Sequence, residues 1–360
     1  MTDSASRFGT TQPPAAAASA PAATAGSASS ATAGTLVPAV EVRDLRVHFP
    51  VRRGLFGTQL VKAVDGVSFS IAPGETLGLA GESGSGKSTV ARTLVRVNRP
   101  TGGSVLLSGA ETARLNGQQL RAYRRRMQMV YQDPYDSLDP KMTVKDAIGE
   151  GLIVRGVPRA KRPAEVEELL TRVNLPAALA GRYPGQLSGG QRQRVSIARA
   201  LAVKPEVIVC DEAVAALDVS IRAQVLNLLK DIQADAGVSY LFISHDLSTL
   251  RFMADRIAIM YVGRLVEYGT SEQVFAEPAH PYTRALMAAV PDVANLGRQR
   301  PAALGGEPPN PANPPSGCAF NPRCPLAVEL CRTVTPPLTR KAGGQLAACH
   351  VVPDAPEVIS

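Results

Sequence analysis

The sequence predicts a layered α/β fold around a buried parallel sheet, and three observations lead to this expectation. Short apolar runs with β-branched residues recur along the chain, helical patterns separate them, and polar residues follow each run. Runs of this kind are typical of parallel strands that are covered on both faces. The runs are TLGLAG at 76–81, MQMVYQD at 127–133, VIVCDE at 207–212 and YLFISHD at 240–246.

Length and composition limit the class of protein. A chain of 360 residues with 45% hydrophobic residues can bury one large core and a smaller appendage. It contains no run of about 18 apolar residues, and its start, MTDSASRFGTT, lacks the basic and apolar regions of a secretory signal. We therefore expect a cytosolic protein that takes part in a membrane process only through partners.

The net charge of +8 raises the question of a nucleic-acid partner. Its best local support is the cluster Arg121, Arg124, Arg125 and Arg126. Aromatic residues make up only 4% of the chain, however, and they are not interleaved with basic residues as in proteins that stack bases. No nucleic acid is expected, because a solvated face, or one facing an anionic membrane surface, is the commoner explanation for such a cluster.

Two breaks in composition divide the chain. Residues 1–38 are almost wholly Ala, Ser, Thr, Gly and Pro, which cannot bury enough apolar surface to fold, so they predict a disordered tail. Prolines and glycines crowd the stretch from about residue 297, which predicts a segment without helix or strand. We expect a main domain over 39–272 with a helical part over about 133–187, an extension over 273–350 and a tail over 351–360.

The stretch GESGSGKST at 81–89 follows an apolar run and precedes a helical pattern, and it matches the Gly-x-x-x-x-Gly-Lys-Ser phosphate loop. Glycines let consecutive backbone N–H groups converge on phosphate oxygens, while the following helix presents its positive end. Lys87 is expected to reach the outer phosphates, and the Ser88 hydroxyl is expected to bind Mg²⁺. The candidate phosphate contacts are Gly81, Ser83, Gly84, Ser85, Gly86, Lys87, Ser88 and Thr89.

The segment LSGGQRQRVSIARAL at 187–201 predicts a second anion-binding helix end. Ser188 and Gln191 have the spacing of a capping box, so a helix is expected to begin here with its free N–H groups exposed. Gly189 and Gly190 leave the backbone open to an anion.

The ends of the predicted strands carry residues suited to chemistry. Ligands bind layered α/β sheets at the carboxyl ends of the strands. Polar residues from separate segments are expected to meet there: Gly81, Gln132, Asp211, Glu212 and His245.

Taken in order, GESGSGKST, LSGGQRQRVSIARA, VIVCDE and SHD resemble the Walker A, signature, Walker B and switch-histidine motifs of an ABC ATPase. The resemblance implies ATP as the ligand and a P-loop NTPase-type layered sheet with an antiparallel β subdomain and a helical subdomain. It also implies that the signature of one subunit covers the nucleotide held by another. A second ATPase subunit, either a copy of this chain or a paralogue, is therefore an expected partner.

The resemblance also implies roles for single residues. Glu212 would polarise the attacking water, and His245 would contact the γ-phosphate. Asp218 matches the D-loop of the family, which acts across the dimer. Phe49 lies where family members often stack an aromatic ring on the adenine, although a surface or core phenylalanine explains this position equally well. The implied ligands of Mg²⁺ are Ser88, Gln132 and Asp211.

The last part of the chain indicates a branch of the family. AEPAHPYTRALMAAVP at 276–291 and GCAFNPRCPLAVELC at 317–331 are similar to the C-terminal extension of oligopeptide and dipeptide importers. This resemblance implies an ATPase that powers peptide import through two integral-membrane permease subunits, with an extracytoplasmic substrate-binding protein as an indirect partner. It places the chain peripherally on the cytoplasmic face of the membrane. Relatives carry glutathione or nickel chelates, and an ABC ATPase acting on nucleic acid is a further alternative.

The helical part is implied to receive a short permease helix. In KRPAEVEELLTRVNLP at 161–176, apolar residues recur at helical spacing and give one apolar face. Its members are Val166, Leu169, Leu170 and Val173. By resemblance, this subdomain and the loop that contains Gln132 form the groove for the permease helix.

Four of the five cysteines lie in the extension, at Cys318, Cys324, Cys331 and Cys349. Clustered thiols in a reducing compartment bind metal more often than they form disulfides. The spacing lacks the paired C-x2-C of structural zinc sites. Some importers of this type carry a [4Fe-4S] cluster on a similar set, so this cluster is the first hypothesis, with zinc or free thiols as alternatives and His350 as a spare ligand.

Overall fold

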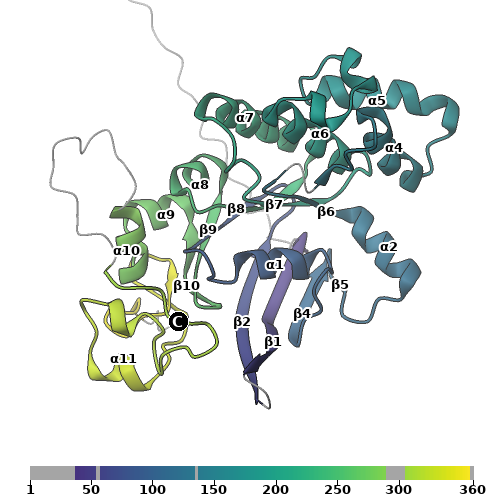
Figure 1. The fold of residues 1–360 in the computed structure, drawn as a ribbon. Helices are drawn as coiled ribbons and strands as arrows, with labels where there is room; N and C mark the ends of the chain where they lie inside the picture. Colours follow the sequence, from purple (N-terminus) through teal and green to yellow (C-terminus); the bar gives the residue numbers. More distant parts are fainter. Residues whose placement is uncertain (1–36, 54–56, 134–136, 289–304, 357–360) are drawn as a thin grey trace, which may run out of the picture. The chain divides into compact units, whose positions relative to one another are not determined.

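The computed structural model describes residues 37–53, 57–133, 137–288 and 305–356 (Figure 1). The tail predicted over 1–38 lies almost entirely outside these ranges. Helices within the described ranges are all too short or too polar to cross a membrane.

A parallel sheet forms the centre of the fold. Its strands are β3 (Thr76–Ala80), β6 (Met127–Val130), β7 (Val207–Asp211), β8 (Ser239–Ile243) and β9 (Arg256–Tyr261). β3 pairs in parallel with β8 and β9, and β7 pairs in parallel with β6 and β8. Every residue of β3, β7 and β8 is buried, as expected for strands covered on both faces. The predicted parallel core is confirmed.

Two hydrophobic clusters cover the two faces of this sheet. Val207 and Val209 of β7 belong to the cluster that contains α1 (Lys87–Leu94). Ile208 and Cys210 belong to the cluster that contains α7 (Val219–Ala236) and α8 (Leu247–Met253). Because successive side chains of a strand point to opposite faces, α1 lies on one side of the sheet and α7 and α8 lie on the other.

A second, antiparallel sheet lies beside α1 (Figure 1). Its strands are β1 (Val40–Arg53), β2 (Gly57–Ile71), β4 (Gly102–Leu107) and β5 (Ala110–Glu111), in the order β2-β1-β4-β5. Buried valines of these strands, such as Val42 and Val67, share one hydrophobic cluster with Val90 of α1. This sheet is the antiparallel subdomain that the sequence resemblance implied.

A group of helices lies around β6 in the sequence, one before it and the rest after it. Val166, Leu169 and Leu170 of the predicted amphipathic helix are buried, which confirms its apolar face. The helices of this part of the chain are α2 (Gly117–Arg126), which precedes β6, and then α4 (Val144–Arg155), η1 (Arg159–Lys161), α5 (Arg162–Arg172), η2 (Ala177–Gly181), η3 (Pro184–Gln186) and α6 (Gly189–Leu201).

The C-terminal part adds antiparallel strands to the central sheet, next to β9. The order of the full sheet is β11-β12-β10-β9-β3-β8-β7-β6. Residues 305–317 form neither helix nor strand, as their prolines and glycines predicted. The elements of this part are β10 (Arg264–Thr270), α9 (Ser271–Ala276), α10 (Pro281–Ala288), η5 (Asn321–Arg323), α11 (Glu329–Thr333), β11 (Thr339–Arg340) and β12 (Leu346–Ala347).

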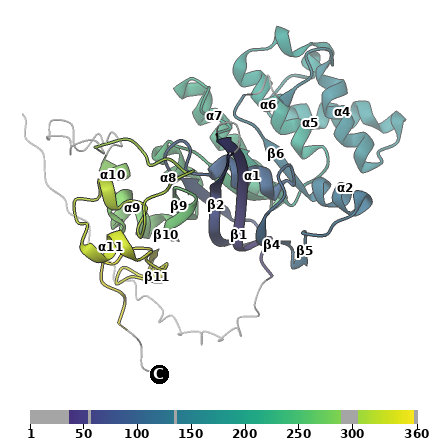
Figure 2. The ribbon, with the colours of Figure 1, turned by 60° about the horizontal axis from the view of Figure 1, so that its bottom comes forward.

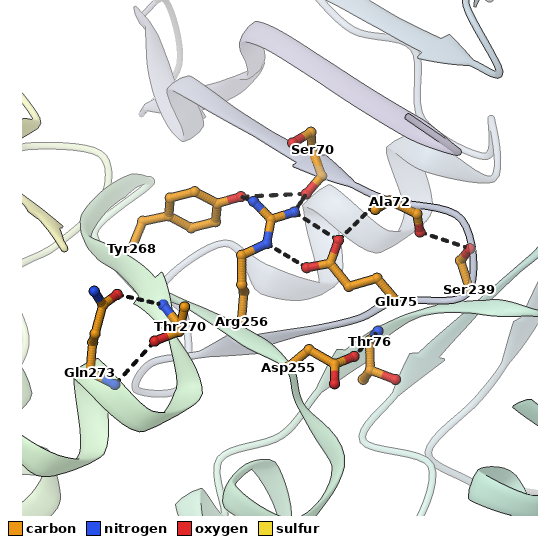
Figure 3. Close-up of polar contacts among 10 residues, drawn as sticks. All are labelled: Ser70, Ala72, Glu75, Thr76, Ser239, Asp255, Arg256, Tyr268, Thr270 and Gln273. Atoms are coloured by element: carbon orange, nitrogen blue, oxygen red, sulfur yellow. Dashed lines mark hydrogen bonds and ion pairs between the residues drawn. The ribbon is translucent and has the colours of Figure 1, made fainter. Parts of the chain in front are cut away.

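At the amino edge of the parallel sheet, polar groups pair with one another (Figure 3). Arg256 forms an ion pair with Glu75 at the start of β3 and donates to the carbonyl of Ser70 at 2.8 Å. It also donates to the hydroxyl of Tyr268 on β10. The Thr76 N–H donates to the carboxylate of Asp255 at 2.8 Å. These contacts tie both sheets together, and they use residues of this chain alone.

Candidate functional site

The phosphate loop connects the carboxyl end of β3 to α1. Gly81 and Gly86 have φ values of 148° and 106°, which side chains rarely adopt. A Cβ atom on Gly81 would lie 2.2 Å from the Met260 carbonyl oxygen, and one on Gly86 would lie 2.2 Å from the Ala63 carbonyl oxygen. The loop therefore accepts only glycine at both positions, because neighbouring backbone walls it in.

Lys87 begins α1 and is almost wholly buried. Its ammonium group donates to the carbonyl of Gly81 at 2.7 Å and to the carbonyl of Glu82 at 2.8 Å. Burial lowers the pKa of Lys87, and the nearby carboxylates, above all Glu212 and Asp211, oppose that shift. A buried cation held only by neutral carbonyl and hydroxyl oxygens of its own loop is well placed to exchange some of them for phosphate oxygens.

Ser88 and Asp211 bring a hydroxyl and a carboxylate together next to the loop. Their oxygens, Oγ and Oδ1, lie 3.1 Å apart, and Asp211 closes β7. Burial raises the pKa of the Asp211 carboxyl, and its hydrogen bond with Ser88 opposes the shift. Hard oxygen donors of this type fit Mg²⁺, which keeps several waters and binds through one or two carboxylates plus substrate phosphates.

Glu212 and His245 meet at the same edge, from the ends of β7 and β8. The Nδ1 atom of His245 lies 3.1 Å from Oε2 of Glu212, and the histidine side chain is 60% exposed. Glu212 has φ 50°, in the left-handed region that residues other than glycine rarely occupy. Its N–H is held by the Ile243 carbonyl at 3.0 Å. Strain of this kind is typical of residues whose position serves function rather than stability.

The second helix end that the sequence predicts to bind an anion is the N-terminus of α6. Ser188 is its N-cap, and Ser188 and Gln191 form both hydrogen bonds of a capping box, which confirms that part of the prediction. The first turn leaves the N–H groups of Gly189 and Gly190 for an outside acceptor. Ser188 is exposed, and the helix packs on α4, α5 and α7.

The remaining predicted nucleotide contacts lie at the surface. Gln132 follows β6, Asp218 precedes α7 as its N-cap residue, and both are exposed. Phe49 lies on β1 opposite Val61 and is 38% exposed, which leaves part of its ring free for stacking.

The four cysteines of the extension lie near one another, and all are free thiols. The Cys318 N–H donates to the Cys331 carbonyl at 2.8 Å. Burial raises the pKa of the Cys318 thiol to about 11, and the other three thiols reinforce the shift. Nowhere in the described ranges are three or more His, Cys, Asp or Glu side chains arranged to hold a metal ion. The geometry therefore gives no support to the predicted cluster. The candidate spare ligand, His350, instead contacts the Val334 carbonyl at 2.9 Å.

Sequence reasoning did not find the groups that hold Glu82, the second residue of the phosphate loop. Its N–H donates to the Tyr282 hydroxyl at 2.8 Å, and its carboxylate receives two hydrogen bonds from Arg323. Both partners lie in segments whose sequence indicates a branch of the family but no contact with the phosphate loop. No local pattern in the sequence connects residues that lie 200 and 241 positions apart.

Models of two protein families match this chain. The ABC transporter family matches residues 64–215, which contain the phosphate loop, β7 and α6. The C-terminal region of oligopeptide/dipeptide transporters matches residues 266–331, which contain Tyr282 and Arg323.

Curated relatives match most of the chain. A probable peptide ABC transporter ATP-binding protein of Sinorhizobium fredii is 50% identical, over 87% of this chain and 89% of the relative. The oligopeptide transport ATP-binding protein AppF of Bacillus subtilis is 46% identical, over 87% and 97%. The dipeptide transport ATP-binding protein DppF of Haemophilus influenzae is 47% identical, over 87% and 96%.

Solved structures show the same fold. One, from Clostridium perfringens, is part of the ABC transporter complex cbiONQ and is 26% identical, with a TM-score of 0.58 over 67% of this chain and 91% of that chain. Another is an ATP-binding cassette in a dimeric post-hydrolysis state bound to ADP and phosphate. It is 28% identical, with a TM-score of 0.57 over 64% of this chain and 98% of that chain.

Proposed function

The chain belongs to the ABC transporter ATP-binding proteins of the oligopeptide/dipeptide branch and is an ATPase, and we propose that it powers the import of peptides through a membrane permease. The names of the relatives support peptides as cargo. Glutathione and nickel chelates are alternative cargoes with the same chemistry at the ATP site.

The observation that carries the proposal is the meeting of phosphate-binding and proton-accepting groups at one sheet edge. Lys87 contacts the loop that ends β3, Ser88 contacts Asp211 at the end of β7, and Glu212 contacts His245 from β8. Hydrolysis of a phosphoanhydride depends almost entirely on positioning and charge stabilisation, and these groups supply both.

Each residue has a defined task in this proposal. The loop N–H groups and Lys87 bind the phosphates, and Glu212 accepts a proton from the attacking water. His245 orients Glu212 through Nδ1, and a simultaneous hydrogen bond from its other nitrogen to the γ-phosphate requires both ring nitrogens to carry protons. Ser88 and Asp211, with Gln132 arriving from its loop, would hold Mg²⁺, which neutralises charge on the phosphates when bound.

A second ATPase subunit completes the site. The N-terminus of α6 and the residues around Asp218 are exposed, and Val219 beside it is 80% exposed. We infer that Ser188, Gly189 and Gly190 of one subunit face the phosphates held by the other, with the partner either a copy or a paralogue.

A groove between α2 and the α4–α6 helices suits a permease helix. A cavity of 620 Å³ there is lined by apolar Ile153 and Val154 and by the basic side chains of Arg124, Arg125 and Arg199, among others. Ile153 and Val154 are 56% and 53% exposed. Tyr131, next to Gln132, lines an adjoining cavity of 220 Å³, so the loop that contacts the nucleotide also reaches the groove. Glu150 also lines this cavity, 3.8 Å from Arg199, but Arg121, Arg124 and Arg125 leave the rim with a net positive charge, which favours a partner helix with acidic residues.

Replacing Glu212 tests the hydrolytic role. In the assembled transporter, Glu212→Gln is expected to lower ATP turnover about 1,000-fold while ATP still binds, because the amide keeps the shape but accepts no proton. Glu206→Gln is the matched control, since Glu206 lies just before β7 and pairs with Arg126 at the surface. Equal turnover in both variants would refute the assignment.

Charge reversal in the groove tests the permease. Arg124→Glu with Arg125→Glu is expected to prevent copurification with coexpressed permease subunits of the transporter, while ATP binding persists. Arg52→Glu, an exposed change on β1, is the control. Copurification of nucleic acid instead of permease would favour the alternative function.

The [4Fe-4S] cluster stays a prediction that the geometry does not support. Iron and sulfide analysis of anaerobically purified protein tests it, together with absorbance in the blue. Colourless protein with one zinc per chain would favour the zinc alternative.

A further inference from the structure

The C-terminal extension reaches into the phosphate loop through Glu82. The Glu82 N–H donates to the Tyr282 hydroxyl at 2.8 Å, and its carbonyl accepts from the Lys87 ammonium at 2.8 Å. Its carboxylate receives the two terminal nitrogens of Arg323, Nη1 at 2.8 Å and Nη2 at 3.0 Å. One residue thus joins the lysine that reaches the phosphates to two side chains of the extension.

Arg323 is held firmly in this position. Its side chain is only 6% exposed, and Nε donates to the Gly305 carbonyl at 3.0 Å. Nη1 also contacts the Tyr261 hydroxyl at 3.3 Å. The pKa of Arg323 is raised, chiefly by its hydrogen bonds with Glu82, so the guanidinium stays charged. A two-pronged pair between a guanidinium and a carboxylate fixes orientation as well as distance.

Aromatic packing anchors the segment that carries Arg323. Phe320 is buried, and its ring centroid lies 5.4 Å from those of Tyr261 and Tyr282. These tyrosines are two of the residues that contact Arg323 and Glu82. Cys324 follows Arg323 directly, and Cys318 lies just before Phe320. The loop that carries the cysteines therefore also carries Arg323, the residue that pairs with Glu82 of the phosphate loop.

We propose that Arg323 is a positioning residue for ATP binding, which holds Glu82 so that the phosphate loop keeps its N–H groups and Lys87 aimed at the phosphates. Arg323 also neutralises a carboxylate that would otherwise stand unpaired beside a triphosphate. The strength of ATP binding thus depends on the order of the cysteine-bearing loop, far away in the sequence. This inference rests on the ATP site described under the proposed function.

Equilibrium binding of Mg·ATP to the full-length chain tests the inference. Arg323→Met, which keeps the length of the side chain, is expected to weaken ATP binding about tenfold, because the unpaired Glu82 repels the phosphates. Adding Glu82→Gln to Arg323→Met removes that repulsion but not the loss of the ion pair, so it is expected to restore only part of the affinity. Arg332→Met is the control, since the Arg332 side chain is 67% exposed and its ion pair with Glu329 is long, at 3.9 Å.

Turnover measurements separate positioning from a loss of folding. In the assembled transporter, Arg323→Met is expected to raise the KM for ATP with kcat changed less than about twofold, and Arg323→Lys is expected to recover part of the affinity. The inference is overturned if Arg323→Met binds ATP as the wild type does, or if the double variant shows no recovery. If Arg323→Met does not fold, Glu82→Gln alone decides, because it also breaks the ion pair that holds the loop: a raised KM for ATP supports the inference, and an unchanged or lower KM refutes it. A wild-type chain that fails to bind ATP would refute the proposed function itself.

Discussion

The two edges of the parallel sheet are both rich in charge, yet they are built for different ends. At the amino edge, Arg256 and Glu75 satisfy each other and the backbone around them (Figure 3). At the carboxyl edge, Lys87 contacts only carbonyl and hydroxyl oxygens of its own loop, and Glu212 occupies a strained backbone conformation. Figure 2 shows α1 with β6 and β9 of the parallel sheet from a second direction.

The comparison shows which features mark a functional site in this fold. Ion pairs and partly buried charges occur at both edges, so charge alone does not distinguish them. Three features distinguish the carboxyl edge. The glycines of its phosphate loop have no room for a side chain, the positive N-terminus of a helix lies there, and some of its polar groups can still bind a ligand. An edge whose polar groups are all paired within the chain stabilises the fold. An edge whose polar groups can still form hydrogen bonds is suited to bind a ligand.

The largest effect on ATP binding is expected from removing the cation of the carboxyl edge. Lys87→Met should weaken Mg·ATP binding about 100-fold, because charged hydrogen bonds to phosphate are lost while the loop keeps its shape. Isothermal titration of the full chain measures this. Unaltered ATP affinity in Lys87→Met would mean that the carboxyl edge is not the phosphate site.

Removing the cation of the amino edge should have the opposite pattern. Arg256→Met is expected to lower the free energy of unfolding by about 2 kcal/mol, because it leaves the largely buried Glu75 carboxylate unpaired. Chemical denaturation measures the loss, and ATP affinity should stay the same. Arg43→Met, at an exposed pair with Glu41, is the control, expected to leave the free energy of unfolding nearly unchanged. A weaker affinity for ATP in Arg256→Met would erase the distinction between the edges.

The smallest effect is a dependence of stability on pH that belongs to the extension. Burial lowers the pKa of His280 from 6.5 to about 3. As pH falls from 6.5 to 5, the unfolded chain takes up a proton that the folded chain does not, so stability falls by at most about 1.4 kcal/mol per pH unit. His280→Asn keeps an acceptor for the Tyr282 N–H and does not titrate.

The difference in pH dependence between the wild type and His280→Asn reports on His280 alone, because the nearby Glu267 is present in both proteins. Burial raises the pKa of Glu267, so its own contribution has the opposite sign: stability is lost as pH rises through that pKa. Denaturation curves at pH 6.5 and pH 5 should diverge less for His280→Asn than for the wild type. The same pH dependence in both would contradict the assignment.

The sequence was sufficient for features that are local or periodic. The parallel strands, the amphipathic face at Val166, Leu169 and Leu170, and the capping box at Ser188 are all present, because each depends on residues a few positions apart. The phosphate loop was predictable for the same reason, since its glycines and Lys87 are contiguous.

Features that depend on long-range packing were not predicted. Arg256 pairs with Glu75 across 181 positions, and Arg323 pairs with Glu82 across 241 positions. No residue pattern identifies such partners, because fold topology brings them together. The cysteines show the reverse case: their number in the extension and the family resemblance predicted a metal ligand set, but no three such side chains in the described ranges are arranged to hold a metal ion.

Amide hydrogen exchange of the full chain with and without Mg·ATP tests the comparison most directly, because it reports on both edges at once. The account predicts slower exchange at residues 81–89 and at the ends of β7 and β8, with no change at residues 72–76 and 254–257. Protection at the amino edge alone, or equal protection at both edges, would contradict it.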